Sequence, residues 1–201
     1  MHALLVIDVQ NDFCPNGALA VTGGDTIVNG INAEMDRFDA VILTQDWHPQ
    51  GHSSFATSHQ AKPMTVIEMP YGPQVLWPDH CIQGSTGASF HPELNSDNAD
   101  VIVRKGYNPA IDSYSAFFEN DHKTPTGLDG YLRTCGITTI TLVGLATDFC
   151  VNYSAVDAAR LGFEVTVDLN LCRAIDFDGS LAAAIAGMKD AGVSIINEGA
   201  A

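Results

Sequence analysis

Two stretches of the chain carry side chains that bind transition metals. The run Asp46-Trp47-His48-Pro49-Gln50-Gly51-His52 brings one carboxylate and two imidazoles together, and a third imidazole follows in Trp77-Pro78-Asp79-His80-Cys81. Neutral imidazole and carboxylate are good ligands for one divalent ion, first of all Zn²⁺, with Fe²⁺ and Mn²⁺ as the other candidates. If three protein side chains hold the ion, the remaining positions are open to water or substrate, as in a catalytic site.

Cys150 is the candidate nucleophile. An apolar, β-branched run at residues 139–145 predicts a strand, and residues 149–161 predict the helix that follows, so Cys150 falls in the first turn of that helix. We expect Thr147 or Asp148 to cap the helix. Unpaired backbone N–H groups at a helix N-terminus favour anions, so we expect a lowered pKa for the thiol and donors for an oxyanion.

Asp8 and Lys105 each stand where an apolar strand ends. An aspartate there is often only a turn residue, a strand-end lysine is usually a surface charge, and a lone cysteine usually packs in the core. Their common placement favours chemistry instead. Asp8 could take the thiol proton and return it to a leaving amine, while Lys105 would stabilise both the carboxylate and the thiolate.

The elements that position these residues alternate between strand and helix. Apolar runs predict strands, and helical spacing predicts helices; the strands are at residues 3–9, 40–44, 101–105, 139–145, 163–169 and 193–196, and the helices at 26–38, 126–135, 149–161 and 180–191. This alternation indicates an α/β fold, a three-layer αβα sandwich around a six-stranded parallel sheet.

We expect a single domain over residues 1–201, in which residues 46–94, rich in Pro, Gly, His and Ser, form a long functional excursion. Ligands bind beyond the carboxyl ends of parallel strands, which is where Asp8, the metal-binding run, Lys105 and Cys150 are expected to meet.

Composition excludes several kinds of partner. The formal net charge is −15, and the nine Lys and Arg residues are scattered, so neither nucleic acid nor an anionic membrane surface is an expected partner. We expect a cytoplasmic protein without a membrane span. The other cysteines, Cys14, Cys81, Cys135 and Cys172, form no CxxC pair, which indicates reduced thiols. The remaining histidines are expected at the surface: His2, His59, His91 and His122.

The motifs resemble those of the nicotinamidases, which are isochorismatase-like cysteine hydrolases. The resemblance covers nearly the whole chain in order, and it rests on these runs: Asp8-Val9-Gln10-Asn11-Asp12-Phe13, Thr44-Gln45-Asp46-Trp47-His48-Pro49, Trp77-Pro78-Asp79-His80-Cys81, Lys105-Gly106, Asp112-Ser113-Tyr114-Ser115-Ala116-Phe117 and Gly144-Leu145-Ala146-Thr147-Asp148-Phe149-Cys150. It implies the isochorismatase-like hydrolase fold and an amidohydrolase that converts nicotinamide and water to nicotinate and ammonia in NAD salvage, and that also accepts pyrazinamide. A homo-oligomer is possible.

The resemblance also implies roles for individual residues. Asp8, Lys105 and Cys150 would form the catalytic triad, and Asp46, His48 and His80 would bind the metal, with the part of His52 left open. Phe13 and Trp77 would flank the pyridine ring, with Tyr114 nearby, although aromatic residues such as these and Trp47 are more often simple core packing. The Leu145–Ala146 peptide bond is expected to be cis, directing the N–H groups of Ala146 and Cys150 at the oxyanion. Asn170-Leu171 departs from the family pattern, away from the triad.

Three alternatives are kept open. Another amide or carbamoyl hydrolase of the same superfamily would be independent of a metal. A metal-binding or interaction protein on an inactive hydrolase fold would not need Asp8, Lys105 and Cys150 together. A redox-sensing thiol would require a resolving cysteine near Cys150, and its sequence neighbours offer none.

Overall fold

A central sheet of six parallel strands organises the computed structural model, which describes residues 1–197. The strands are β1 (His2–Ile7), β2 (Ala40–Asp46), β5 (Val101–Lys105), β6 (Thr139–Leu145), β7 (Glu164–Arg173) and β8 (Ser194–Ile196). They lie in the order β5-β2-β1-β6-β7-β8, and every neighbouring pair is parallel. The six predicted strands and their parallel arrangement are confirmed.

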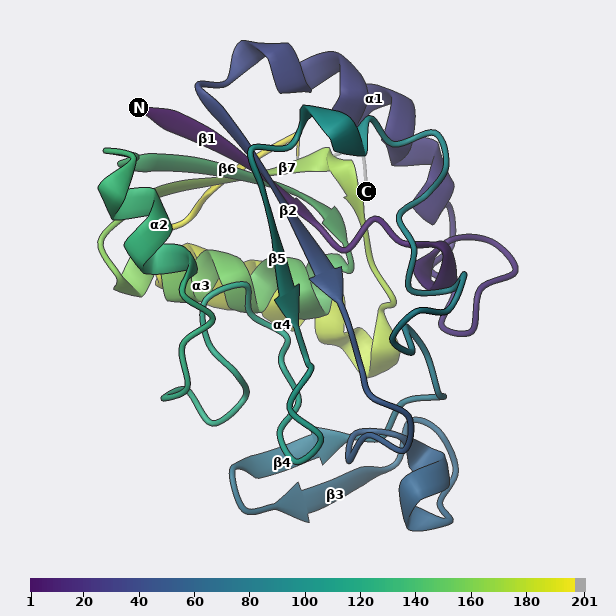
Figure 1. Ribbon diagram of the computed structural model, residues 1–201. Coiled ribbons are helices and arrows are strands. Elements are labelled where there is room, and N and C mark those ends of the chain that lie inside the picture. Colours follow the sequence, from purple (N-terminus) through teal and green to yellow (C-terminus); the bar gives the residue numbers. More distant parts are fainter. Residues whose placement is uncertain (198–201) are drawn as a thin grey trace.

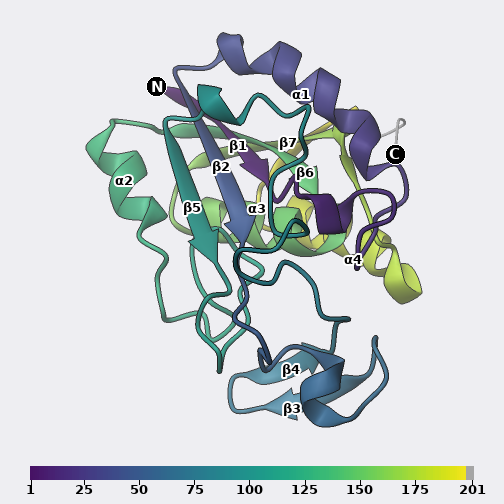
Figure 2. The ribbon, with the colours of Figure 1, turned by 45° about the vertical axis from the view of Figure 1, so that its right-hand side comes forward.

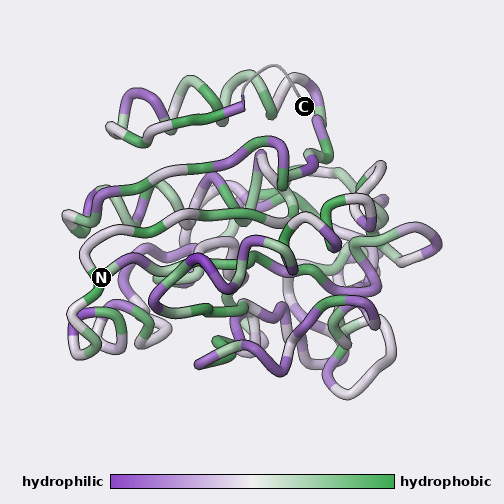
Figure 3. Tube along the Cα trace, turned by 90° about the horizontal axis from the view of Figure 1, so that it is seen from above, coloured by the Kyte–Doolittle hydropathy of each residue, from purple (hydrophilic) through white to green (hydrophobic). Residues whose placement is uncertain are grey.

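Helices cover both faces of this sheet. Figure 1 shows α1 (Val28–Glu34) on one side and α3 (Asn152–Arg160) and α4 (Ser180–Asp190) on the other, with α2 (Leu128–Thr134) near the start of β6. Two separate clusters of buried side chains fill the spaces between the layers. In Figure 3 hydrophobic colour runs along the inner strands, whereas the outer helices alternate in colour. The predicted α/β three-layer architecture with four helices is therefore confirmed.

Several element boundaries differ from the prediction. The helix expected at 26–38 is a short α-helix between two 3₁₀ turns, Gly24–Ile27 and Met35–Arg37. Strand β7 runs on to Arg173, and its pairing with β6 is interrupted because Leu142 pairs with Val167 whereas Gly144 pairs with Cys172. Asn170 and Leu171, which depart from the family pattern, lie in this irregular part of β7. Within residues 1–197, none of the helices is long and apolar enough to cross a bilayer.

The excursion after β2 contains structure that its composition did not predict. Residues Val66–Met69 (β3) and Gly72–Val75 (β4) form an antiparallel hairpin, and Ala56–His59 forms a 3₁₀ turn. A lone hairpin is marginal in water, but Met64 and Val75 pack against the main core cluster. The hairpin lies beyond the carboxyl ends of β2 and β5, as Figures 1 and 2 show. The excursion therefore adds a layer over the edge of the sheet where ligands are expected.

Candidate active site

Three charged side chains meet at the carboxyl ends of β1, β2 and β5. Asp46 and Lys105 are register partners at the ends of β2 and β5, and Asp8 directly follows β1. The Lys105 Nζ lies 2.8 Å from Asp8 Oδ2 and 2.7 Å from Asp46 Oδ1, and it also donates to the Ser113 carbonyl oxygen at 2.9 Å. All three charged side chains are buried. The Thr44 hydroxyl donates to Asp8 Oδ1 at 2.6 Å, which fixes the orientation of that carboxylate.

Burial and charge pull the pKa values of this cluster apart. Burial would lower the pKa of Lys105, but Asp46 and Asp8 raise it well above its ordinary value, so the ammonium stays charged. Burial would likewise raise the pKa of Asp46, yet Lys105 and His48 hold it well below the usual range. For Asp8, burial together with the Asp46 charge outweighs Lys105, and the pKa is raised. Asp8 is therefore the carboxylate better suited to accept a proton.

Cys150 reaches the same cluster from the turn after β6. Gly144 has a φ of 119°, and a Cβ there would lie 2.2 Å from the Ile7 carbonyl oxygen, so only glycine fits. The Leu145–Ala146 bond is cis, as expected, and Thr147–Val151 forms a π-helical turn ahead of α3. This turn places the Cys150 Sγ 3.4 Å from Lys105 Nζ and close enough to Asp8 and Asp46 for their charges to act on the thiol. The predicted convergence of the sulfur, the carboxylate and the ammonium is confirmed.

Two local expectations about this turn were wrong. The pKa of the Cys150 thiol is raised well above its ordinary value, because burial and the Asp8 and Asp46 charges outweigh the effect of Lys105. The helix has no side-chain cap, since the N-cap position is Ala146. The Asp148 carboxylate instead accepts from the Ile175 and Asp176 N–H groups and from the Ser180 hydroxyl, so it holds the β7–α4 loop.

The expected metal ligands form a compact buried group. Ligand atoms of Asp46, His48 and His80 all lie within 4.8 Å of one another. The Asp46 Oδ2 is 3.3 Å from His48 Nε2 and 3.6 Å from His80 Nε2. His48 Nδ1 faces the Gly106 carbonyl oxygen and His80 Nδ1 faces the Pro78 carbonyl oxygen, both at 2.8 Å, so each Nδ1 carries the proton.

This arrangement fits a divalent cation. With Nδ1 protonated, each Nε2 turns a lone pair toward the Asp46 carboxylate, and two acceptors at such distances repel unless a cation or a proton lies between them. The buried His48 Nε2 has no hydrogen-bond partner among the described residues. One carboxylate and two imidazoles oriented by carbonyl oxygens make the donor set that Zn²⁺, Fe²⁺ or Mn²⁺ takes.

His52 lies beside this group but turns elsewhere. Its ring centroid is 4.4 Å from that of His48. Its Nε2 lies 2.8 Å from the Asn108 carbonyl oxygen and its Nδ1 2.7 Å from the Ser54 hydroxyl, so both ring nitrogens have partners. His52, His48 and Asp112 form a second set of close ligand atoms. His52 is thus a neighbour of His48 and lies outside the Asp46–His48–His80 group. Of the histidines expected at the surface, His59 and His122 are exposed, while His2 and His91 are half-buried.

A small, partly open pocket reaches the sulfur. Aromatic and charged side chains share its wall, which comprises Phe13, Leu19, Asp46, Trp77, His80, Asp112, Tyr114, Ala146, Phe149, Cys150 and Ile175. The expected substrate-binding residues Phe13, Trp77, Tyr114 and Ala146 all line it. Trp47 does not line the pocket. Its ring instead stacks with Arg104, whose guanidinium carbon lies 3.9 Å from the ring centroid.

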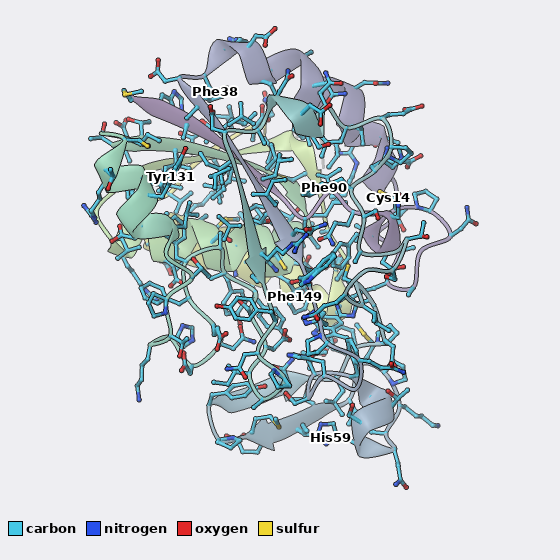
Figure 4. The ribbon with its side chains drawn as sticks, in the orientation of Figure 1. Cys14, Phe38, His59, Phe90, Tyr131 and Phe149 are labelled. Carbon is cyan, nitrogen blue, oxygen red and sulfur yellow. The ribbon has the colours of Figure 1, made fainter. Side chains whose placement is uncertain are left out.

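Phe149 is a wall residue that we did not predict. Its ring centroid is 4.8 Å from Trp77 and 5.6 Å from Tyr114, with edge-to-face geometry, and Figure 4 shows it at the centre of the molecule. The Trp77 indole N–H also donates to the Tyr114 hydroxyl at 3.1 Å. The sequence signal that could have identified Phe149 is its position directly before Cys150. Asp112, whose carboxylate accepts from Gln74 Nε2 at 2.8 Å, is a second wall residue that we did not predict, although the motif that contains it was recognised.

Sequence comparison agrees with the fold. Residues 2–198 match the isochorismatase domain family. A nicotinamidase from Acinetobacter baylyi is 51% identical over 196 residues, covering 97% of this chain and 92% of the relative, and a nicotinamidase from Escherichia coli is 46% identical over 179 residues, covering 87% and 84%. The chain belongs to the isochorismatase family. Within that family it is an amidohydrolase of the nicotinamidase group, as these relatives are, and the resemblance seen in its motifs is confirmed.

Solved structures extend the comparison to bound ligands. A nicotinamidase/pyrazinamidase from Acinetobacter baumanii has a TM-score of 0.95 at 53% identity, covering 97% of this chain and 95% of that one. The L. infantum protein PnC1 in complex with nicotinate has a TM-score of 0.86 at 38% identity, covering 100% and 94%. A Pyrococcus horikoshii pyrazinamidase in complex with zinc has a TM-score of 0.79 at 32% identity, covering 97% and 98%.

Proposed function

We propose that the protein hydrolyses nicotinamide to nicotinate and ammonia through a thioester on Cys150. The observation that carries this proposal is the position of the Cys150 sulfur, which lies 3.4 Å from Lys105 Nζ, within the electrostatic reach of Asp8, and opens onto an aromatic pocket. A flat heteroaromatic amide suits such walls. The nicotinate bound to the L. infantum relative supports this class of substrate.

Asp8 is the proposed general base. A lysine ammonium has three protons, and Lys105 faces two carboxylates and the Ser113 carbonyl oxygen as well as the sulfur. The oxygen atoms are stronger acceptors than the sulfur, so they take the hydrogen bonds of Lys105. The thiol can then donate its own proton to Asp8. The raised pKa of Asp8 suits this transfer, because a base with a pKa nearer neutrality can both take and return a proton. As the proton leaves the thiol, Lys105 stabilises the negative sulfur.

The two half-reactions then use the same residues. The Cys150 sulfur bonds to the amide carbon, and the N–H groups of Ala146 and Cys150 are the proposed donors to the oxyanion. The C–N bond breaks as the proton held by Asp8 passes to the departing ammonia, which leaves a thioester. Asp8 then takes a proton from water and the hydroxyl adds to the thioester carbon. The C–S bond breaks, the proton on Asp8 returns to the sulfur, and the acid leaves as nicotinate with its proton released to solvent.

Asp46, His48 and His80 are the proposed ligands of one divalent ion, for which the zinc bound to the Pyrococcus horikoshii relative makes Zn²⁺ the first choice. Bound there, the ion would act as a Lewis acid beside the pocket and would orient the pyridine nitrogen. Phe13 and Trp77 would flank the ring and Tyr114 would close its edge. Pyrazinamide keeps a ring nitrogen in the same place and is the proposed second substrate. Nicotinate production would serve NAD salvage.

The experiment is ammonia release from nicotinamide, measured on the protein as purified, after chelation, and after Zn²⁺, Fe²⁺ or Mn²⁺ is added back. We expect turnover that falls on chelation and returns with at least one of the ions. Full turnover after complete metal removal would favour another amide hydrolase of the same superfamily. No ammonia release under any of these conditions would refute the proposed reaction.

A further inference from the structure

The side chain of Gln10 holds the backbone of a proposed metal ligand. Gln10 is fully buried. Its Oε1 accepts from the Asp46 N–H at 2.8 Å, and its Nε2 donates to the Asp46 carbonyl oxygen at 2.9 Å and to the Ala88 carbonyl oxygen at 2.8 Å. The side-chain amide thus binds Asp46 as a neighbouring strand would, at the point where β2 ends.

The side chain of Asp12 holds the segment that carries a second ligand. Its Oδ2 accepts from the Cys81 N–H at 2.7 Å, directly after His80, and its Oδ1 accepts from the Ala18 N–H at 3.1 Å. Gly87 packs against this carboxylate so closely that a Cβ there would lie 2.1 Å from Oδ2. Asp12 therefore ties the His80 segment to the loop that carries Phe13 and Leu19.

The segment between these two side chains is itself fixed. Asn11 N–H donates to the Ser89 carbonyl oxygen and Asp12 N–H to the Gly87 carbonyl oxygen, both at 3.0 Å. The Asn11 side chain donates to the Thr86 carbonyl oxygen at 2.8 Å. Segment 10–12 is thus bonded to segment 86–89, so Gln10 and Asp12 project from a rigid support.

We propose that Gln10 and Asp12 are positioning residues for the metal, with Gln10 setting Asp46 and Asp12 setting His80. The inference rests on the metal site proposed above and extends it to residues that need not touch the ion. Asp8, Gln10 and Asp12 then alternate along one segment, which joins the proposed base to the supports of two ligands. Partners that orient ligands typically change metal affinity by about 10- to 100-fold when they are lost.

The test is Zn²⁺ affinity, measured by competition with a chromophoric chelator, for the wild-type protein and two matched variants. Gln10→Glu keeps the size of the side chain but removes both donated hydrogen bonds. Asn32→Asp is the control, because the Asn32 amide also donates to one backbone carbonyl oxygen, that of Glu93 at 2.7 Å, and accepts from the Asn95 N–H at 2.9 Å, in an exposed region. Thermal unfolding of the zinc-free proteins measures what each change costs the fold alone.

We expect Gln10→Glu to weaken Zn²⁺ binding by about 10- to 100-fold and Asn32→Asp to leave it within about twofold, even where both lower the unfolding temperature. If Gln10→Glu does not fold, Asp12→Asn gives the same test through His80, since its NH₂ group would face an N–H donor. Wild-type affinity in a folded variant would overturn this inference alone, as would an equal loss in the control. A wild-type protein that does not bind Zn²⁺ would overturn the proposed metal site and this inference with it.

Discussion

Removal of the buried Lys105 ammonium should destabilise the fold in a way that depends on pH. In Lys105→Met the aliphatic part of the side chain is kept, but Asp8 and Asp46 lose the cation that lies 2.8 and 2.7 Å from them. Asp8 is fully buried and Asp46 is only 4% exposed, so solvent replaces the lost cation poorly. Breaking a buried pair by removing one partner costs about 3–5 kcal/mol. For a domain of this size that corresponds to a fall in unfolding temperature of about 6–20 °C.

The sign of the pH dependence follows from the same carboxylates. Without Lys105 the folded-state pKa of Asp46 is no longer held low, and that of Asp8 rises further. A carboxyl group with a raised folded pKa stabilises the fold only when protonated, so the variant recovers stability as the pH falls. In the wild type Asp46 keeps its low pKa, and its contribution is lost only at much lower pH. The deficit of the variant should therefore be largest near pH 8 and smaller near pH 5.

The assay is urea unfolding of the metal-free wild type and Lys105→Met at pH 8 and at pH 5, in the presence of a chelator. Equal stability of the two proteins at pH 8 would refute the assignment of Lys105 as the counter-ion of both carboxylates. A deficit that grows toward pH 5 would refute the sign of the argument.

The other predictions concern the ligands, the thiol, the turn and the pocket. His48→Ala should lower the amount of metal bound per chain, measured by elemental analysis; unchanged stoichiometry would exclude it as a ligand. Because burial raises the pKa of Cys150, its alkylation in the metal-free protein should accelerate steadily from pH 6 to pH 9, and a plateau below pH 7 would show a preformed thiolate. Gly144→Ala should cost more than ~1 kcal/mol in thermal unfolding, since the added Cβ meets the Ile7 carbonyl oxygen, and wild-type stability would contradict that contact. Phe149→Ala should raise KM for nicotinamide more than it lowers kcat, and an unchanged KM would remove Phe149 from the substrate wall.

The strand ends made much of this site predictable. Asp8 and Lys105 follow apolar runs, and a parallel sheet brings such positions to one edge whatever lies between them in sequence. The candidate metal ligands could be recognised because Asp46 and His48 are close in sequence and their donor chemistry is specific. Cytoplasmic location and self-association stay predictions.

Properties set by several distant groups at once could not be read from the sequence. The thiol was expected to have a lowered pKa because a helix N-terminus is a local feature, whereas the burial and the two carboxylate charges that raise it come from the tertiary structure. Asp148 was expected to cap its own helix, but its carboxylate bonds to the β7–α4 loop. The β3–β4 hairpin was missed because Val66 and Val75 are paired across a turn rich in Gly and Pro.

The most direct measurement is the rate of ammonia release from nicotinamide by Cys150→Ala, compared with wild type and with Cys172→Ala, which removes another buried thiol outside the pocket. If Cys150 forms the thioester, its removal should lower turnover by at least ~10³-fold while metal content is unchanged, and Cys172→Ala should remain active. Substantial turnover by Cys150→Ala would contradict the account.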